Sequence, residues 1–463
     1  MSHHDHDDDV VTNTSSNPHL LEIAEARFTR RQTLFGGFSA TTAALFGGLS
    51  LAGCDDDNDP STPPAPEPIP TPKLSFVPVA KSTADVLTVP DGYTARALYA
   101  LGDPIKDGIA AWADNGSETG ASYADRAGDH HDGMYYFGLA ATGSTPAFKS
   151  SDRGILCMNH EALTVTYLHA AGPTSGAGGV RTVEDECIKE MNAHGVSVIE
   201  VKKDGMGQFQ VVKGSLNRRI TTFTEMELSG PVRGDDQVKT KFSTNGTKTR
   251  GTVNNCANGY TPWGTYLTCE ENWAGYFSRG AADNAARSAK EVVSLNRYGN
   301  AQGANGRHRW ETIAGDNFER WNTSVLGATS ADDYRNVINT FGFVVEIDPY
   351  DPTKTPKKRT ALGRFAHEGA WPGPVRAGKP VVFYMGDDNR GDYIYKFVSQ
   401  ANWDPADANK ADRMAVGDKY LDQGKLYVAK FNANGTGEWK ELSFGVNGPV
   451  SYTHLTLPTI LLV

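Results

Sequence analysis

The sequence predicts an all-β protein, a β-propeller with long loop insertions and a few short helices. From about residue 76 onward, short runs rich in β-branched and aromatic residues are bounded by Gly, Asp, Asn or Pro, which is typical of strands separated by turns. Segments with the apolar spacing of a helix are few. Radial blades are the all-β arrangement that accommodates a chain of 463 residues, although no clean repeat period is visible.

The clearest pair of strands forms a predicted hairpin. Residues 196–201 (VSVIEV) lead into the turn KKDG, and residues 208–212 (QFQVV) follow as the partner strand. Residues 341–347 (FGFVVEI) form another strand, which ends at an Asp-Pro turn. Further strands are expected at residues 134–139, 154–158, 266–269, 380–385, 393–398 and 425–431. The helix candidates are residues 182–194 and 281–292.

The first 53 residues have the layout of an export signal. Arg30 and Arg31 precede a small, apolar run that ends in LAGC at residues 51–54, the order at which a signal is cut and the cysteine thiol is acylated. The alternative is an ordinary cleaved signal with an incidental Cys54. We expect a periplasmic or extracellular protein that the twin-arginine machinery exports and that is attached to the membrane through lipidated Cys54.

The rest of the chain divides by composition. Residues 54–75 are acidic and rich in proline, so we expect an extended linker there. The predicted propeller domain spans residues 76–450, and residues 451–463 form an unrelated tail. The formal net charge is −10, part of it in Asp-rich segments outside the domain, which argues against a nucleic-acid partner.

Carboxylates recur at or near the ends of predicted strands, mostly without a nearby lysine or arginine. They lie in four clusters, at residues 129–133, 159–161, 269–272, and 367–369 together with 386–389. Any one cluster could be a set of turn residues, because Asp and Asn cap turns routinely. Glu forms turns poorly, however, and gathered carboxylates without counter-charges need a cation. The joint pattern predicts a multi-carboxylate metal site.

Cys256 lies in a loop rich in Gly, Asn and Pro that leads into the strand ending at Glu270 and Glu271. It could therefore ligate the same metal, and the alternatives are a disulfide with Cys269 or a buried thiol. Oxygen ligands alone would suit calcium or magnesium, whereas a thiolate would indicate a transition metal. His160 and His367 precede glutamates, and neighbours on a strand point to opposite sides, so we expect the glutamates to be the ligands.

The run NNCANGYTPWGTYLTCEEN at residues 254–272 resembles the signature of the PhoX-type alkaline phosphatases, a family of exported phosphomonoesterases. The resemblance extends in order over roughly residues 76–450. The other matching runs are VPDGY (89–93), HDGM (131–134), NHE (159–161), LNRRIT (216–221), GRFAHEGA (363–370), GDDN (386–389) and DYIYKF (392–397).

The resemblance implies a β-propeller whose centre holds iron and calcium, with phosphate monoesters as substrates. By position, the residues implied for catalysis and the iron shell are Cys256, Glu271, Glu368 and Asp387. Those implied for calcium or supporting roles are Glu270, Asp388, Glu161 and Asp132. Phosphate esters arrive as dianions, and metal ions stabilise the charge that develops on the transferring oxygens, so no serine nucleophile is required.

The chain departs from the family near Val450, where the similar sequence stops although family members continue. We expect a C-terminally truncated propeller, with a tail at residues 451–463 that is artefactual. An unclosed propeller leaves unpaired strand edges. The competing functions are therefore a non-catalytic calcium-binding propeller or inactive fragment at the cell envelope, and another metal-centred propeller hydrolase such as a lactonase or phytase.

Overall fold

The computed structural model describes residues 76–443, which fall into two compact units divided between Ala97 and Leu98. In the short unit, residues 76–97 contain no helix or strand, and the ring of Phe76 packs edge-on against Tyr93 with centroids 5.6 Å apart. The predicted signal, Cys54, the linker and the tail at 451–463 lie outside the described residues. No described helix combines the length and apolar character that a membrane crossing requires.

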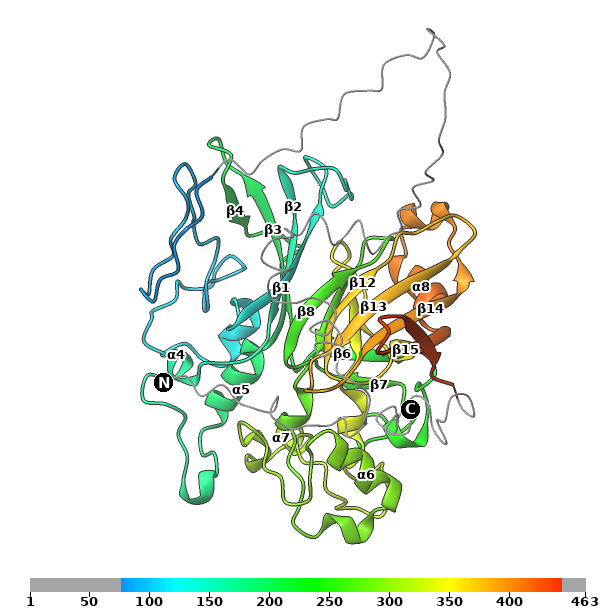
Figure 1. The fold of residues 1–463 in the computed structure, drawn as a ribbon. Helices are drawn as coiled ribbons and strands as arrows, with labels where there is room; N and C mark the ends of the chain where they lie inside the picture. The colour runs from blue at the N-terminus through cyan, green and yellow to red at the C-terminus, as the bar shows by residue number, and fades with distance from the viewer. Residues whose placement is uncertain (1–75, 444–463) are drawn as a thin grey trace, which may run out of the picture. The chain divides into compact units, whose positions relative to one another are not determined.

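The large unit contains three β-sheets (Figure 1). The first has the order β1-β2-β3-β4, and β5 also pairs with β3. Every pair in it is antiparallel. Its strands are β1 (His131–Gly138), β2 (Arg153–His160), β3 (Gly195–Lys203), β4 (Phe209–Val212) and β5 (Arg218–Ile220).

The second sheet has the order β7-β6-β11-β10-β9-β8, in which only the β6–β11 pair is parallel. The third is an antiparallel meander from β12 to β16. The strands of the second sheet are β6 (Glu225–Ser229), β7 (Lys248–Arg250), β8 (Asn255–Tyr260), β9 (Tyr266–Glu270), β10 (Val344–Ile347) and β11 (Lys357–Arg359). Those of the third are β12 (His367–Pro372), β13 (Pro380–Asp387), β14 (Ile394–Asn402), β15 (Gly424–Phe431) and β16 (Gly437–Glu441).

The three sheets meet along one edge strand each. Strand β8 contacts both β1 and β12, so these strands form the centre and the sheets radiate from it (Figure 1). A Cβ on Gly259 of β8 would lie 1.8 Å from the carbonyl oxygen of Ala370 on β12, so only glycine allows the two backbones to approach this closely. The arrangement confirms the predicted fold class, because it is a propeller-like all-β fold with insertions and few short helices.

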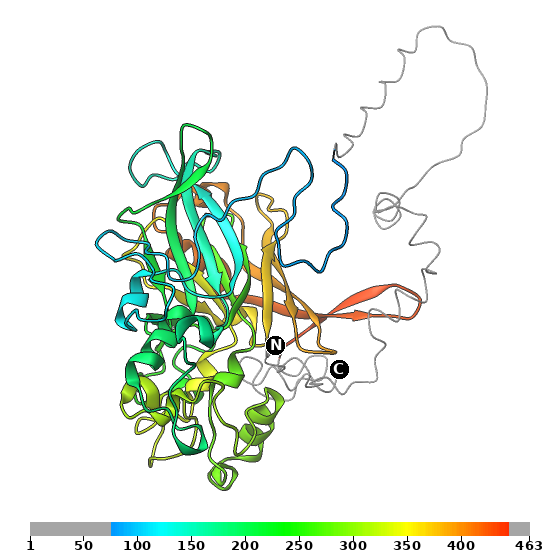
Figure 2. The same ribbon diagram turned by 90° about the vertical axis from the view of Figure 1, so that its left-hand side faces the viewer.

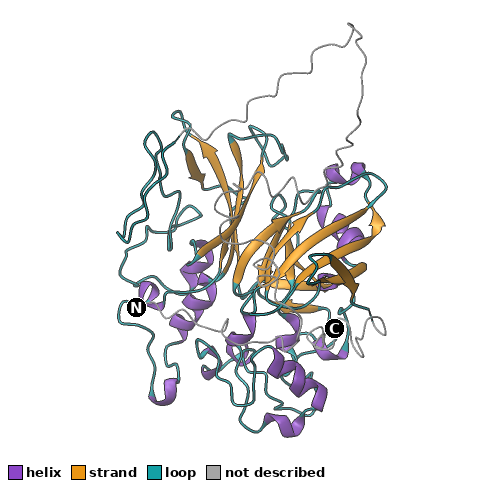
Figure 3. Cartoon of the chain, viewed as in Figure 1, coloured by secondary structure: helices purple, strands orange, loops and turns teal. Residues whose placement is uncertain are grey.

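A largely helical insertion separates β9 from β10. Its helices are η5 (Trp273–Tyr276), η6 (Asp283–Ala286), α6 (Ala289–Arg297), η7 (Trp310–Thr312), α7 (Asp316–Glu319) and η8 (Val337–Thr340). An aromatic core that includes Trp273, Trp310 and Trp321 holds it together. Both views place α6 and α7 at the same end of the sheets (Figures 2 and 3). The insertion therefore stands at one end of the propeller-like centre.

The other described helices lie in the remaining connections. They are η2 (Ala121–Asp125), α4 (Val165–Leu168), η3 (Ala177–Gly179), α5 (Glu184–Ala193), η4 (Asp236–Val238), η9 (Thr360–Leu362), η10 (Pro405–Asn409) and α8 (Arg413–Leu421).

Most predicted elements are confirmed, and two have different bounds. The 196–201 and 208–212 hairpin is β3–β4, and the 182–194 helix is α5. The helix predicted at 281–292 is wrong in extent, because Ser288 and Glu291 form a capping box that starts α6 at Ala289. The strand predicted from residue 341 begins only at Val344, because the amides of Gly342 and Phe343 donate to Glu270 instead of joining a ladder.

Candidate metal centre

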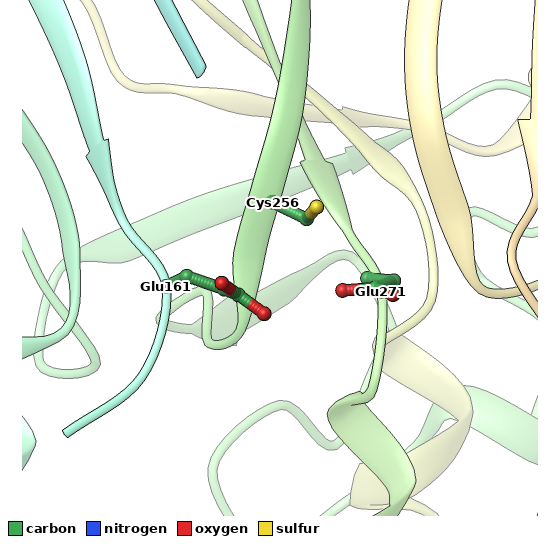
Figure 4. Close-up of side chains that lie close together, drawn as sticks. All are labelled: Glu161, Cys256 and Glu271. Atoms are coloured by element: carbon green, nitrogen blue, oxygen red, sulfur yellow. The ribbon is translucent and has the colours of Figure 1, made fainter. Parts of the chain in front are cut away.

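Three predicted ligands converge where the central strands begin or end. Glu161 follows the last residue of β2, Cys256 is the second residue of β8, and Glu271 follows the last residue of β9. One ligand atom from each lies within 4.8 Å of the other two (Figure 4). Two carboxylates and a thiol from different strands thus face one small space.

Three further acids join this group, which we call the six-residue cluster. Asp132 of β1 lies beside Cys256 and contributes to the rise in the pKa of its thiol, and Asp388, which follows β13, contributes in the same way to the raised pKa values of Glu271 and Glu368. The cluster comprises Asp132, Glu161, Cys256, Glu271, Glu368 and Asp388. All six come from the predicted set. The cluster is buried at Cys256 and Glu271 and exposed at Glu368 and Asp388, so it opens to solvent on one side.

The negative charges of the cluster oppose one another. Burial and hydrogen bonding to Asp388 raise the pKa of Glu271 to about 10, and desolvation and the same partner raise the pKa of Glu368 to about 7. Burial and Asp132 also raise the pKa of Glu161, and burial and Glu271 raise the pKa of the Cys256 thiol. Without a cation, these groups hold protons that their free forms would release. Oxygen donors and one sulfur therefore fit bound metal ions, which would replace the protons.

Asn159 of β2 fixes the main chain at Cys256. Its Nδ2 donates to the carbonyl oxygens of Cys256 and Ala257, the latter at 3.1 Å. Its Oδ1 accepts hydrogen bonds of 2.8 Å from the hydroxyls of Tyr266 and Thr268 on β9. Because Asn159 is fully buried with both ends bonded, it locks β2 against β8 and β9. The sequence reasoning named the 159–161 cluster without giving Asn159 this role.

Asn254 is a second supporting residue that the sequence reasoning missed. Its φ is +52°, in the left-handed region that asparagine tolerates better than most residues. Its carbonyl oxygen accepts from the Glu271 amide at 3.0 Å, and its side chain accepts from the Asn272 amide at 2.5 Å. Asn254 thereby joins the start of β8 to the end of β9. The asparagine-rich run before Cys256 is the sequence signal that could have identified it.

Glu270 does not face the cluster. It is fully buried, its Oε1 accepts from Lys358 Nζ at 2.7 Å, and its Oε2 accepts from the Gly342 and Phe343 amides at 2.9 and 3.1 Å. Adjacent residues on a strand point to opposite sides, so Glu270 and Glu271 have different environments. Protein donors occupy both oxygens of Glu270.

Asp387 lies in another buried group. Burial and the nearby Asp392 raise its pKa well above the ordinary value, and Arg297 partly offsets this effect. Arg297 Nη2 donates to both oxygens of Asp392 at 3.0 Å. The structure therefore places Asp387 with Arg297 and Asp392, while the next residue, Asp388, joins the cluster.

The remaining candidates have structural partners. His160 is bonded to Ser197 Oγ, and His367 Nε2 is 3.0 Å from the carbonyl oxygen of Gly363. Burial lowers the pKa of both histidines, so they are neutral. Cys256 and Cys269 form no disulfide, and the four cysteines in the described part of the chain are free and buried.

Comparisons with known proteins identify the family of the chain. The family model for alkaline phosphatase PhoX matches residues 74–457. The solved structure of Pseudomonas fluorescens PhoX in complex with vanadate, a transition state analogue, matches with a TM-score of 0.71 and 33% sequence identity. The match covers 83% of this chain and 62% of that one, so this chain spans less than two thirds of its length. None of the curated protein sequences compared with the chain matches it. The chain belongs to the PhoX alkaline phosphatase family.

Proposed function

We propose that this protein is a metal-dependent phosphatase that hydrolyses phosphate monoesters and releases inorganic phosphate. The observation that carries the proposal is the six-residue cluster, in which a buried thiol and carboxyl groups from several strands, with raised pKa values, gather at the propeller-like centre. The vanadate bound to Pseudomonas fluorescens PhoX supports phosphoryl transfer as the chemistry.

Iron and calcium are the ions that we propose for the cluster. Cys256 supplies a soft sulfur donor beside Glu161 and Glu271, which suits iron. Asp132, Glu368 and Asp388 supply the hard oxygen donors that calcium prefers. When bound, the ions supply the positive charge that a phosphate dianion and its transition state require. We leave Glu270 and Asp387 out of this ligand set because both have other partners.

Two asparagines of the chain hold the proposed ligands in place. Asn159 and Asn254 hold the backbone at Cys256 and Glu271, so the ligands are positioned before substrate arrives. The exposed side at Glu368 and Asp388 leaves a route for the ester. Because these groups are already in place, they can stabilise the charge that develops in the transition state without first having to reorganise.

The proposal is tested with the full chain loaded with iron and calcium. We expect it to hydrolyse p-nitrophenyl phosphate, to lose that activity when chelated, and to recover it when both metals return. Elemental analysis should find iron together with calcium. Calcium alone, with no turnover, would favour a non-catalytic calcium-binding propeller, and hydrolysis of lactones or phytate alone would favour another hydrolase.

We also propose that the protein is exported by the twin-arginine route to the periplasm or beyond, with Cys54 as a lipid anchor. The Arg30-Arg31 pair before the apolar run supports this proposal. That route accepts folded proteins, which suits a domain that acquires iron before export. Replacing both arginines with lysine should retain the protein in the cytoplasm, and Cys54→Ser should abolish labelling by a fatty-acid probe. Normal export of the Lys-Lys variant would refute the route.

A further inference from the structure

The three central strands carry aromatic side chains just beyond the six-residue cluster. On each strand, the aromatic residue follows the cluster residue in the direction of the chain. The pairs are Asp132 and Tyr135 on β1, Cys256 and Tyr260 on β8, and Glu368 and Trp371 on β12. Because β8 contacts both β1 and β12, the three rings come together, and we call them the aromatic layer.

The rings of the aromatic layer support one another. Tyr135 and Tyr260 stack with their centroids 4.6 Å apart and an angle of 14° between their planes. Trp371 meets both rings edge-on, with its centroid 5.4 Å from that of Tyr260 and 6.3 Å from that of Tyr135. Stacked and edge-on contacts at these distances are the arrangements that aromatic pairs favour. The two tyrosines therefore hold the indole of Trp371 in a defined orientation.

Trp371 points to the same side of β12 as Glu368 of the cluster. Their register partners on β13 are Tyr384 and Gly386, which alternate with one residue between them and so face the same side. A β-bulge that follows Glu368 adds the extra residue that this alignment requires. A Cβ on Gly369 would lie 3.5 Å from Trp371 Cδ1, so the indole lies over the residue next to Glu368.

Part of the indole remains open to solvent. Trp371 is 46% exposed, and so is its register partner Tyr384. Glu368 and Asp388, the exposed members of the cluster, lie on β12 and directly after β13. The cluster and the indole are therefore open to solvent on the same side. A single exposed tryptophan needs no explanation, but this one is held by two rings and lies next to a proposed metal ligand.

We propose that Trp371 binds the organic group of the substrate and that this group contains an aromatic ring. The inference rests on the proposed function and names its substrate class, the aryl phosphate monoesters. With the phosphate at the cluster, the ring of the ester packs against the exposed part of the indole, while Tyr135 and Tyr260 support the indole from behind. A flat aromatic group gains more from this contact than a small alkyl group does, because rings add their own pairing energy to the area that they bury.

The test measures by calorimetry how the metal-loaded full chain binds two phosphonates that cannot be hydrolysed as esters. Phenylphosphonate carries a ring and methylphosphonate does not. We expect the wild type to bind phenylphosphonate about 10-fold more tightly. Trp371→Ala should abolish this preference while the affinity for methylphosphonate and the metal content stay unchanged, and Trp371→Phe should keep part of it. The control is Phe148→Ala, which removes an exposed ring that packs against Tyr350 instead and should keep the full preference.

Equal affinities of the wild type for the two phosphonates, or binding of neither, would overturn the inference. An equal loss of both affinities in Trp371→Ala would also overturn it, because the ring would then have only a structural role. Sedimentation tests another occupant of this surface: a wild-type dimer that dissociates in Trp371→Ala would mean that a second copy of the chain covers the indole, which would overturn the inference. A wild type that prefers phenylphosphonate through Trp371 but hydrolyses no ester would refute only the proposed function.

Discussion

Cys256 Sγ lies 3.8 Å from Glu368 Oε1, although the two residues belong to different sheets. Their contact is possible because β8 and β12 are adjacent at the centre. A thiol with a raised pKa next to a carboxyl with a raised pKa is an unfavourable pair for two anions. A metal ion between or beside them would allow both to ionise. The packing of β8 against β12 therefore brings together two of the proposed metal ligands.

Replacing Cys256 with Ser should therefore remove iron selectively. The hydroxyl is a poor ligand for a soft metal, and even the loss of an outer partner of a ligand costs about 10–100-fold in affinity. We expect iron content and phosphatase activity to fall more than about 10-fold, while calcium is retained. Cys269→Ser is the control, since Cys269 is a buried free thiol on the neighbouring strand β9. Normal iron content in Cys256→Ser would contradict the ligand assignment.

Replacing Glu by Gln should have different effects at the adjacent residues Glu270 and Glu271, lowering stability at the first and metal affinity at the second. Glu270→Gln leaves Lys358 buried without its counter-charge, which should destabilise the fold by about 3–5 kcal/mol. Folded Glu270→Gln protein should still bind metal. Glu271→Gln should instead lose metal affinity with little loss of stability in the metal-free form. Denaturant unfolding and elemental analysis of both variants decide the matter, and metal loss in folded Glu270→Gln would count against the assignment.

The sequence allowed the strands and most of the cluster to be predicted, because both depend on local patterns. The hairpin β3–β4 has β-branched runs around a turn, and the residues of the six-residue cluster mostly stand where apolar runs begin or end. The division between Glu270 and Glu271 did not follow from the sequence, since it depends on which face of β9 meets Lys358. Strand alternation says that the two differ, but not which one points to the centre.

The supporting residues were harder to predict because they are distant in the chain. Asn159 and Asn254 come from two different segments, and their types fit ordinary core and turn positions equally well. The start of α6 is a different case, because the capping box of Ser288 and Glu291 is a local signal that apolar spacing alone overlooks. The supporting residues therefore depend on tertiary contacts, whereas the proposed ligands could be predicted from local sequence patterns.

Metal removal should make stability depend on pH with a definite sign. Glu271 titrates at about 10 in the metal-free fold, above its ordinary value of 4.5. Its protonated form is favoured by folding, so this stabilisation is present at low pH and is lost as pH rises towards 10. Between these limits, stability should fall by about 1.4 kcal/mol per pH unit for each such group. Denaturant unfolding of chelated protein from pH 5 to 9 should show a slope that Glu271→Gln reduces and that added metal abolishes. A slope equal in the wild type and in Glu271→Gln would contradict this.

Glu190 should give the protein the opposite dependence at acid pH. This fully buried carboxylate on α5 accepts from Arg181 Nη1 at 2.8 Å and from the indole of Trp310 at 2.7 Å, and it lies 3.0 Å from His169 Nε2. Burial alone would raise its pKa, but the hydrogen bonds from His169 and Arg181 lower it to about 2. Its contribution is therefore present above pH 4.5 and is lost as pH falls to about 2, a difference of about 3 kcal/mol.

The matched variants on α5 are Glu190→Gln and Glu186→Gln. Glu190→Gln should cost about 3–5 kcal/mol at pH 7, because Arg181 stays buried without its main partner. The gap in stability between this variant and the wild type should narrow as the pH falls below 4.5. Glu186 also pairs with Arg181, at 3.2 Å, but is partly exposed, so its replacement should cost less than about 1 kcal/mol. Urea unfolding at pH 7, 4.5 and 3 measures both. If the difference in unfolding free energy between the wild type and Glu190→Gln stays constant across this pH range, protonation of Glu190 is not the cause of the loss of stability at acid pH.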